Sequence, residues 1–132
     1  MGLIMGIAKP LQTLFLSLAL GLAAAALAAP AAAAAELVML ERPGCGWCLR
    51  WHREIAPTYP KTAEGRQAPL RRVDVTEPWP ADLAGIAGDR YTPTFIVVEN
   101  GVEVARLRGY PGEDFFWPLL AEMLARLARQ DG

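Results

Sequence analysis

Residues 36–51, which read ELVMLERPGCGWCLRW, carry the pattern that decides the fold. The apolar run 36–40 is typical of a buried strand, and the segment ERPG that follows breaks it. A helix is expected to begin at Cys45 and to carry Cys48 one turn further on. These are the only two cysteines of the chain. This helix needs no other cap if Cys45 and the loop carbonyls cover its first turn, and Pro57 ends or kinks it. The sequence therefore predicts a strand that delivers a Cys-x-x-Cys pair to a helix N-terminus.

The remaining elements follow from hydrophobic periodicity and turn residues. Residues 62–69 are expected to form a polar loop. The expected elements are a strand at 70–76, a short helix at 81–88, strands at 94–99 and 102–109, and a long helix at 113–130. The expected buried stripes are Leu49, His52, Ile55 and Ala56, flanked by Trp51, in the first helix, and Phe115, Leu119, Met123 and Leu127 in the last.

The order β-α-β-α-β-β-α predicts an α/β fold with a central four-stranded mixed sheet flanked by helices. The first two strands should be parallel, because a helix joins them through a right-handed crossover. The last two should form an antiparallel hairpin, because Asn-Gly at 100–101 is a preferred two-residue turn.

Residues 1–35 have the three parts of a secretory signal peptide. Lys9 is the only charge in an otherwise apolar stretch, and Ala33 and Ala35 supply small residues for cleavage. The stretch is also long enough to cross a bilayer, so an uncleaved membrane anchor is the alternative. With the signal peptide, residues 36–132 form the mature domain, and export permits a disulfide.

The chain carries 13 basic and 14 acidic residues, for a formal net charge of −1. This balance argues against a nucleic-acid partner, which would favour a concentrated basic patch. The hydrophobic fraction of 53% is inflated by the first 35 residues. Composition thus argues against a nucleic-acid binder, and the mature domain is small but can hold a single core.

A cysteine at a helix N-terminus has a thiol pKa lowered from about 8.5 to between roughly 3.5 and 7.5. Cys45 would then be the exposed nucleophile, and Cys48, one turn further, would resolve a mixed disulfide. Zinc needs about four ligands, whereas Cys45, Cys48 and His52 give three at most. Haem attachment needs histidine after the second cysteine, where Leu49 stands. A purely structural disulfide and a redox pair that turns over stay open, and the redox pair is favoured.

The strand–CxxC–helix unit, the segment YTPTF at 91–95 and the closing hairpin and helix together resemble the thioredoxin superfamily. The resemblance covers residues 36–132 and implies a thioredoxin-like fold with thiol–disulfide oxidoreductase activity and no bound cofactor or metal. It implies that Pro93 is cis and faces the disulfide. It also implies that the backbone of Thr92 pairs with a substrate strand. Trp47 is expected to contact the substrate, because a tryptophan between the cysteines tends to be exposed next to the sulfur.

The sequence around these motifs is similar to that of the small exported thioredoxins of bacterial sulfur-oxidation systems, the SoxS type. That resemblance implies a periplasmic, monomeric reductase of protein disulfides that restores a carrier-protein cysteine. Its electrons would come from a membrane thiol carrier. A disulfide oxidant or isomerase, and a non-catalytic binding module on the same scaffold, are the alternatives.

The chain departs from the cytoplasmic thioredoxin motif Trp-Cys-Gly-Pro-Cys. Gly44 precedes the first cysteine, and Trp47 stands where the motif has proline. The family's buried acid, six residues before the first cysteine, is replaced by Met39, and Glu41 is a poor substitute if it lies in the loop. Arg72 is expected at the place of a family lysine.

Overall fold

The computed structural model describes Gly2 and residues 35–130. The expected signal peptide falls on residues 1–35 and so lies outside the described residues, apart from Gly2 and Ala35. No helix in the described part of the chain is long and apolar enough to span a membrane. The elements are β1 (Ala35–Glu41), α2 (Gly46–Glu54), η1 (Tyr59–Lys61), α3 (Ala63–Gln67), β2 (Leu70–Asp74), η2 (Ala81–Leu83), β3 (Thr94–Glu99), β4 (Val102–Arg108), α4 (Glu113–Leu124) and α5 (Leu127–Gln130).

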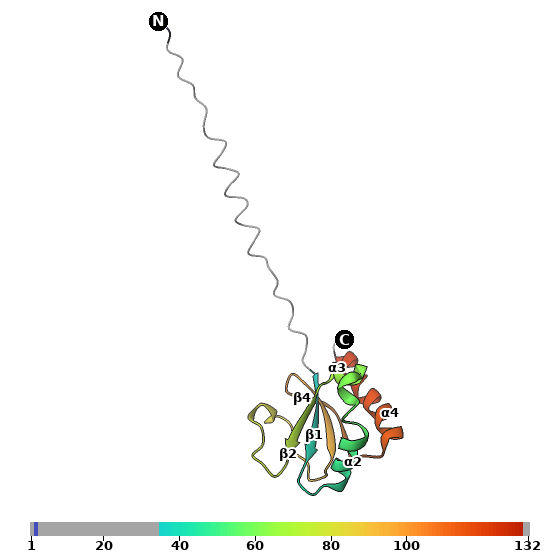
Figure 1. Ribbon diagram of the computed structural model, residues 1–132. Helices are drawn as coiled ribbons and strands as arrows, with labels where there is room; N and C mark the ends of the chain where they lie inside the picture. The colour runs from blue at the N-terminus through green and yellow to red at the C-terminus, as the bar shows by residue number, and fades with distance from the viewer. Residues whose placement is uncertain (1, 3–34, 131–132) are drawn as a thin grey trace. The chain divides into compact units, whose positions relative to one another are not determined.

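The four strands form one mixed sheet, as the sequence predicts, and their order in the sheet is β2-β1-β3-β4 (Figure 1). β1 runs parallel to β2, and β3 runs antiparallel to both β1 and β4. The β3–β4 hairpin closes through Asn100 and Gly101, whose φ angles are 51° and 75°. Both residues are therefore left-handed, as the favoured two-residue hairpin turn requires.

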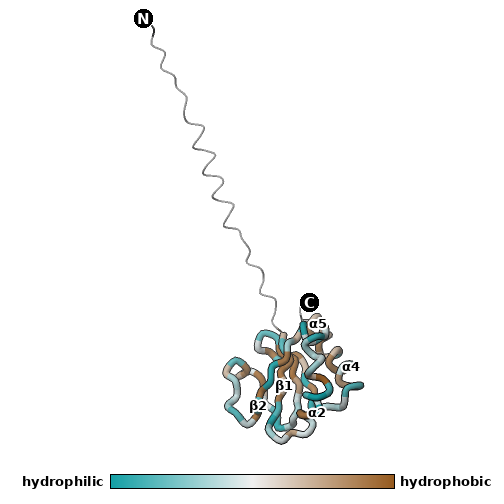
Figure 2. Tube along the Cα trace, in the orientation of Figure 1, coloured by the Kyte–Doolittle hydropathy of each residue, from teal (hydrophilic) through white to brown (hydrophobic). Residues whose placement is uncertain are grey.

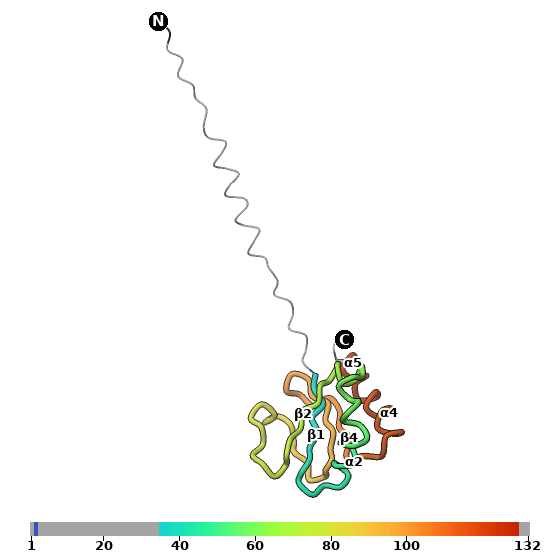
Figure 3. Tube along the Cα trace, viewed as in Figure 1, coloured from blue at the N-terminus to red at the C-terminus, as the bar shows by residue number. Residues whose placement is uncertain are grey.

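The two central strands are buried on both faces, because their alternate side chains enter two different clusters. On one face Leu37 and Met39 of β1 join Phe95 of β3 and pack against α2 and α4. On the other face Val38 and Ile96 pack against the segment 79–86. Figure 2 shows these strands as the brown centre of the domain, and Figure 3 shows that the helices and the segment after β2 cover opposite sides.

Two local predictions between the first helix and β3 are wrong. Instead of a helix at 81–88, the chain makes a single 3₁₀ turn at Ala81–Leu83, and the amide of Ile86 bonds to Leu83 three residues back. Gly85 and Gly88 disfavour a longer helix in this stretch. The expected loop at 62–69 contains α3, whose first turn is capped by the hydroxyl of Thr62 accepting the amide of Gly65.

The expected closing helix is divided into α4 and α5, and its buried stripe differs from the prediction. Phe115 is 66% exposed. The buried residues of the two helices are Phe116, Leu120, Met123, Leu124 and Leu127. A repeat of four residues drifts around a helix of 3.6 residues per turn, whereas this mixture of three- and four-residue steps stays on one face.

Gly65 lies against the backbone of η1, so we expect Gly65→Ala to destabilise the domain. A Cβ at this position would stand 1.9 Å from the carbonyl oxygen of Tyr59, a backbone atom that cannot rotate away. Overpacking of this kind costs about 1–3 kcal/mol. At Gly85 a Cβ would meet its nearest atom at 3.7 Å. Urea unfolding should therefore show a clearly lower free energy of unfolding for Gly65→Ala and almost no change for Gly85→Ala. Equal decreases in the two variants would contradict this packing.

Candidate active site

The two cysteines form a disulfide at the N-terminus of α2. Cys45 is the N-cap residue, and its Sγ accepts a hydrogen bond from the amide of Cys48 at 3.1 Å. The prediction that Cys45 itself caps the helix is therefore confirmed. Cys45 is 8% exposed and Cys48 is 3% exposed, so both are buried and Cys45 is the more accessible. A thiolate formed at Cys45 would face the amides and the positive end of the helix dipole.

The loop and the helix around the disulfide differ in burial from the prediction. Gly44 adopts a φ of 75°, a left-handed conformation that favours glycine and turns the chain into α2. Leu49, expected in the core, is 57% exposed, whereas Trp51 is fully buried. The indole of Trp51 packs against the ring of Phe95, with their centroids 5.4 Å apart. Trp51, and not Leu49, therefore anchors the cysteine-bearing helix to the sheet.

The Thr92–Pro93 peptide bond is cis, as the resemblance implies. Pro93 precedes β3, and its carbonyl oxygen accepts the amide of Gly109 at 2.7 Å. Because Thr94 pairs with Leu40 near the end of β1, Pro93 lies at the sheet end from which the chain enters the Cys-x-x-Cys loop. The topology thus brings the predicted site segments to one end of the sheet.

Asp89 holds the segment before the cis peptide in place, a role that the sequence analysis missed. Its carboxylate accepts the amide of Tyr91 at 3.1 Å and the guanidinium of Arg106 at 3.1 Å, and it also pairs with Arg108. The Asp89 side chain is only 6% exposed. The hydrogen bond from Arg108, followed by those from Tyr91 and Arg106, lowers the pKa of Asp89 to about 2. The available sequence signal was an aspartate in a loop, because such a side chain commonly accepts a hydrogen bond from the backbone amide two residues further on.

Stability should therefore depend on Asp89 in a pH-dependent way. The folded-state pKa lies below the ordinary value of 3.8, so ionised Asp89 stabilises the fold above that value, and this contribution is lost as pH falls toward about 2. We expect Asp89→Asn to be less stable than wild type at neutral pH, with the difference shrinking as pH falls through this window. Urea unfolding at several pH values measures the difference, and a difference that does not change with pH would contradict the assignment.

Trp47, between the cysteines, is 56% exposed. The guanidinium of Arg50 lies over its ring, 5.5 Å from the centroid. Arg50 pairs with Glu54 at 2.7 Å, and the hydroxyl of Tyr110 donates to the other carboxylate oxygen of Glu54 at 2.6 Å. The hydrogen bond from Tyr110, ahead of that from Arg50, lowers the pKa of Glu54. The exposed indole is thus supported by a chain of contacts that reaches the loop after β4.

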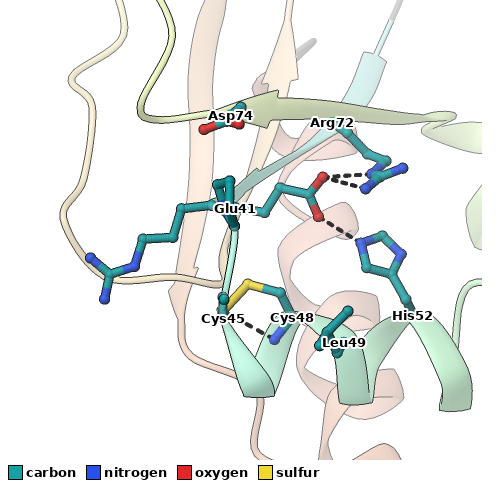
Figure 4. A pocket seen from close by; sticks show the side chains of 10 residues that line it. Glu41, Cys45, Cys48, Leu49, His52, Arg72 and Asp74 are labelled. Carbon is teal, nitrogen blue, oxygen red and sulfur yellow. Dashed lines mark hydrogen bonds and ion pairs between the residues drawn. A yellow bond between two sulfur atoms is a disulfide. The ribbon is translucent and has the colours of Figure 1, made fainter.

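A pocket of about 240 Å³ opens beside the disulfide (Figure 4). The predicted residues Trp47, Thr92 and Pro93 are not among those that line it. Its lining consists of Glu41, Arg42, Pro43, Gly44, Cys45, Cys48, Leu49, His52, Arg72 and Asp74. In the described residues no cluster of three or more His, Cys, Asp and Glu side chains could hold a metal ion.

Glu41 lies on a strand and not in the loop. From the sequence it is a poor substitute for the family's acid only if it lies in the loop, so that condition is not met. It is the last residue of β1, and its carboxylate contacts both His52 and Arg72. Met39, at the family's acid position, is fully buried in the core. The side chain that meets the disulfide pocket from β1 is therefore the acid two residues later.

The fold and this site define a thiol–disulfide oxidoreductase: a mixed four-stranded sheet presents a Cys-x-x-Cys disulfide at a helix N-terminus, beside a cis-proline loop. The chain belongs to the thioredoxin superfamily. It is 48% identical to the periplasmic thioredoxin SoxS from Paracoccus pantotrophus, whose structure in the reduced form aligns with a TM-score of 0.66 over 70% of this chain and 98% of that one.

More distant solved structures share the fold. Thioredoxin from Malassezia sympodialis is 22% identical, with a TM-score of 0.50 over 68% of this chain and 75% of that one. Thioredoxin-2 of the malaria parasite is 19% identical, with a TM-score of 0.52 over 68% of this chain and 84% of that one. No protein-family model and no curated protein sequence matches the chain.

Proposed function

We propose that this protein is a periplasmic reductase that reduces disulfides or mixed disulfides on partner proteins. The observation that carries the proposal is the Cys45–Cys48 disulfide at the N-terminus of α2, in a chain 48% identical to a periplasmic thioredoxin. The periplasmic location also rests on residues 1–35, which we propose to be a cleaved signal peptide. The resemblance to sulfur-oxidation thioredoxins supports a carrier-protein cysteine as one substrate.

In the proposed reaction, Cys45 attacks a sulfur of the substrate disulfide and forms a mixed disulfide. Cys48 then attacks Cys45, releases the second substrate thiol and closes the Cys45–Cys48 disulfide. The substrate gains two electrons and the dithiol loses two. Reduction of the new disulfide requires an external thiol donor, for which we propose a membrane thiol carrier. The protein is proposed to act as a monomer.

Three further residues are proposed to receive the substrate. The exposed indole of Trp47 would contact the partner protein next to the sulfur. Thr92 and the cis Pro93 would align an extended substrate segment, with the backbone of Thr92 supplying the hydrogen bonds. The cis geometry and the position of this loop at the cysteine end of the sheet support this proposal.

The reduction potential of the Cys45–Cys48 couple separates a reductase from a disulfide oxidant or isomerase. A value near about −270 mV is expected for a reductase, and a value near about −120 mV indicates an oxidant. The potential is measured by equilibration with dithiothreitol redox buffers. A value at the oxidising end would refute the proposed direction.

Partner capture separates an enzyme from a binding module. Cys48→Ala removes the resolving thiol, so the mixed disulfide formed by Cys45 should persist and accumulate. The trapped partners are identified after non-reducing electrophoresis of periplasmic extracts, with the double variant Cys45→Ala/Cys48→Ala as the control. If no partner is trapped above the control, turnover on protein disulfides is not the function.

A further inference from the structure

The loop after β4 ties together the two segments that are proposed to contact the substrate. The amide of Gly109, its first residue, donates to the carbonyl oxygen of Pro93 at 2.7 Å and so holds the cis-proline segment. The hydroxyl of the next residue, Tyr110, donates to Oε2 of Glu54 on α2 at 2.6 Å. Two neighbouring residues thus contact both the cis-proline segment and the helix that carries the cysteines.

The Tyr110 hydroxyl has a fixed position because the rest of this side chain belongs to the core. Tyr110 is only 6% exposed, and its ring meets that of Phe116 edge-on, with the centroids 5.9 Å apart. Close packing of this kind holds a side chain in one rotamer. A hydrogen bond from a fixed hydroxyl to a carboxylate is also stronger than one between neutral groups. Tyr110 therefore holds the Glu54 carboxylate in one place on the surface of α2.

Glu54 in turn positions Trp47 through Arg50. The other carboxylate oxygen, Oε1, accepts a hydrogen bond from Nε of Arg50 at 2.7 Å, and the guanidinium of Arg50 lies over the Trp47 ring. An exposed ion pair of this kind contributes little by itself, because two long side chains lose rotamer freedom when they pair. Here Tyr110 has already immobilised one partner, so only Arg50 has to be ordered. The exposed indole between the cysteines is thus supported from the core.

We propose that Tyr110 and Glu54 are positioning residues that set the spacing between the two substrate contacts, the Trp47 indole and the cis-proline segment. The inference rests on the proposed function for the assignment of those contacts. An extended segment of a partner protein that engages both contacts needs them at one separation, and a preformed separation lowers the cost of ordering them on binding. The two residues therefore act on the binding of protein substrates, whereas small disulfides that do not span both contacts react without them.

Capture of a peptide by the full chain carrying Cys48→Ala isolates this binding step. The probe is a decapeptide of alternating valine and serine around one central cysteine, which is activated as a mixed disulfide with thionitrobenzoate. The Cys45 thiolate attacks the peptide sulfur, a disulfide forms between them, and thionitrobenzoate leaves as a coloured thiolate. The initial rate at increasing peptide concentration gives a half-saturating concentration and a limiting rate. Capture needs only an accessible thiolate, so the experiment stands even if the reduction potential refutes the reductase direction.

DTNB (5,5′-dithiobis(2-nitrobenzoic acid)) is the small disulfide for comparison. It has the same leaving group as the activated peptide but no peptide segment. Its rate of reaction with Cys45 therefore reports the reactivity of the thiolate without the contribution of substrate docking.

Tyr110→Phe removes only the hydroxyl and should raise the half-saturating peptide concentration about tenfold, the effect of losing one hydrogen bond to a charged group. The limiting rate and the DTNB rate should stay unchanged, because the lost interaction contributes to binding alone. Glu54→Ala breaks the contacts with both Tyr110 and Arg50, so it should raise the half-saturating concentration by at least as much. Adding Tyr110→Phe to Glu54→Ala should change it by no more than about twofold, because both substitutions act through the same carboxylate.

Tyr59→Phe is the matched control. The Tyr59 hydroxyl also donates a hydrogen bond of 2.6 Å, to the carbonyl oxygen of Ala68 before β2, and Tyr59 is 1% exposed. Its loss should lower the free energy of unfolding without raising the half-saturating concentration. Trp47→Ala is the reference for the substrate contact itself, and it should raise the half-saturating concentration at least as much as Tyr110→Phe does.

The four variants separate the possible failures. If Trp47→Ala raises the half-saturating concentration while Tyr110→Phe and Glu54→Ala leave it unchanged, the inference is overturned and the proposed contact stands. If Trp47→Ala has no effect, the proposed contact is refuted and the inference falls with it. An equal rise in Tyr59→Phe, or a parallel loss of the DTNB rate in Tyr110→Phe, would assign the effect to a disturbed fold and would also overturn the inference.

Discussion

Cys45→Ser is expected to lower the rate of disulfide reduction by about 10³-fold or more, because the covalent nucleophile is removed. Cys45 is the N-cap of α2 and the more exposed of the two cysteines. A thiolate at that position is stabilised by the helix N-terminus, whereas a serine hydroxyl stays protonated at neutral pH. Reduction of insulin by dithiothreitol, followed by turbidity, measures the loss.

Cys48→Ser is the matched comparison for this experiment. It keeps the attacking thiol, so it should still form a mixed disulfide with the substrate in one step and then stall. The two serine variants therefore differ in which intermediate accumulates, and mass spectrometry distinguishes them. If Cys48→Ser forms no mixed disulfide while Cys45→Ser does, the roles of the two cysteines are reversed.

Phe116→Ala is expected to lower the free energy of unfolding by about 3–5 kcal/mol, a loss typical of a large aromatic side chain in the core. Phe116 is fully buried, and its ring centroid lies 5.1 Å from that of Phe95, 5.8 Å from that of Trp51 and 5.9 Å from that of Tyr110. The total free energy of unfolding of a domain is about 5–15 kcal/mol, so the variant should lose a large fraction of its stability.

Phe115→Ala removes the same ring from the neighbouring position of α4. Phe115 is 66% exposed, so its loss should change the free energy of unfolding by only about 0.5 kcal/mol. Thermal and urea unfolding of the two variants form a direct comparison. Similar losses would show that α4 is rotated relative to the sheet from the position described here.

Periodicity predicted much of the fold because the strands carry their own signal. β1 and β3 are buried on both faces and read as continuous apolar runs, and the Asn100–Gly101 turn is marked by residues that tolerate left-handed backbone. Two local signals were interpreted wrongly. Gly85 and Gly88 disfavour the helix that was expected at 81–88, and the buried stripe of α4 and α5 follows three- and four-residue steps instead of a repeat of four.

In the candidate site, some residues could be predicted from the sequence, whereas others were found only in the folded structure. The cysteine pair was found because its spacing is local, and the cis Pro93 was inferred from a family resemblance. Asp89 carried only a weak local signal, because its partners Arg106 and Arg108 are 17 and 19 residues away and meet it only in the folded chain.

The sequence by itself determined the chemistry of this protein: two cysteines in a Cys-x-x-Cys spacing after an apolar run, and a Thr-Pro before a strand. These features are local, so covalent spacing and backbone preference are enough to define them. Only the tertiary structure decided what surrounds the sulfurs. The parallel register places Met39 opposite Arg72 and Glu41 opposite Asp74, and α2 packs so that His52 reaches Glu41. The environment of the disulfide is set by contacts between distant segments, and those contacts exist only once the core has formed.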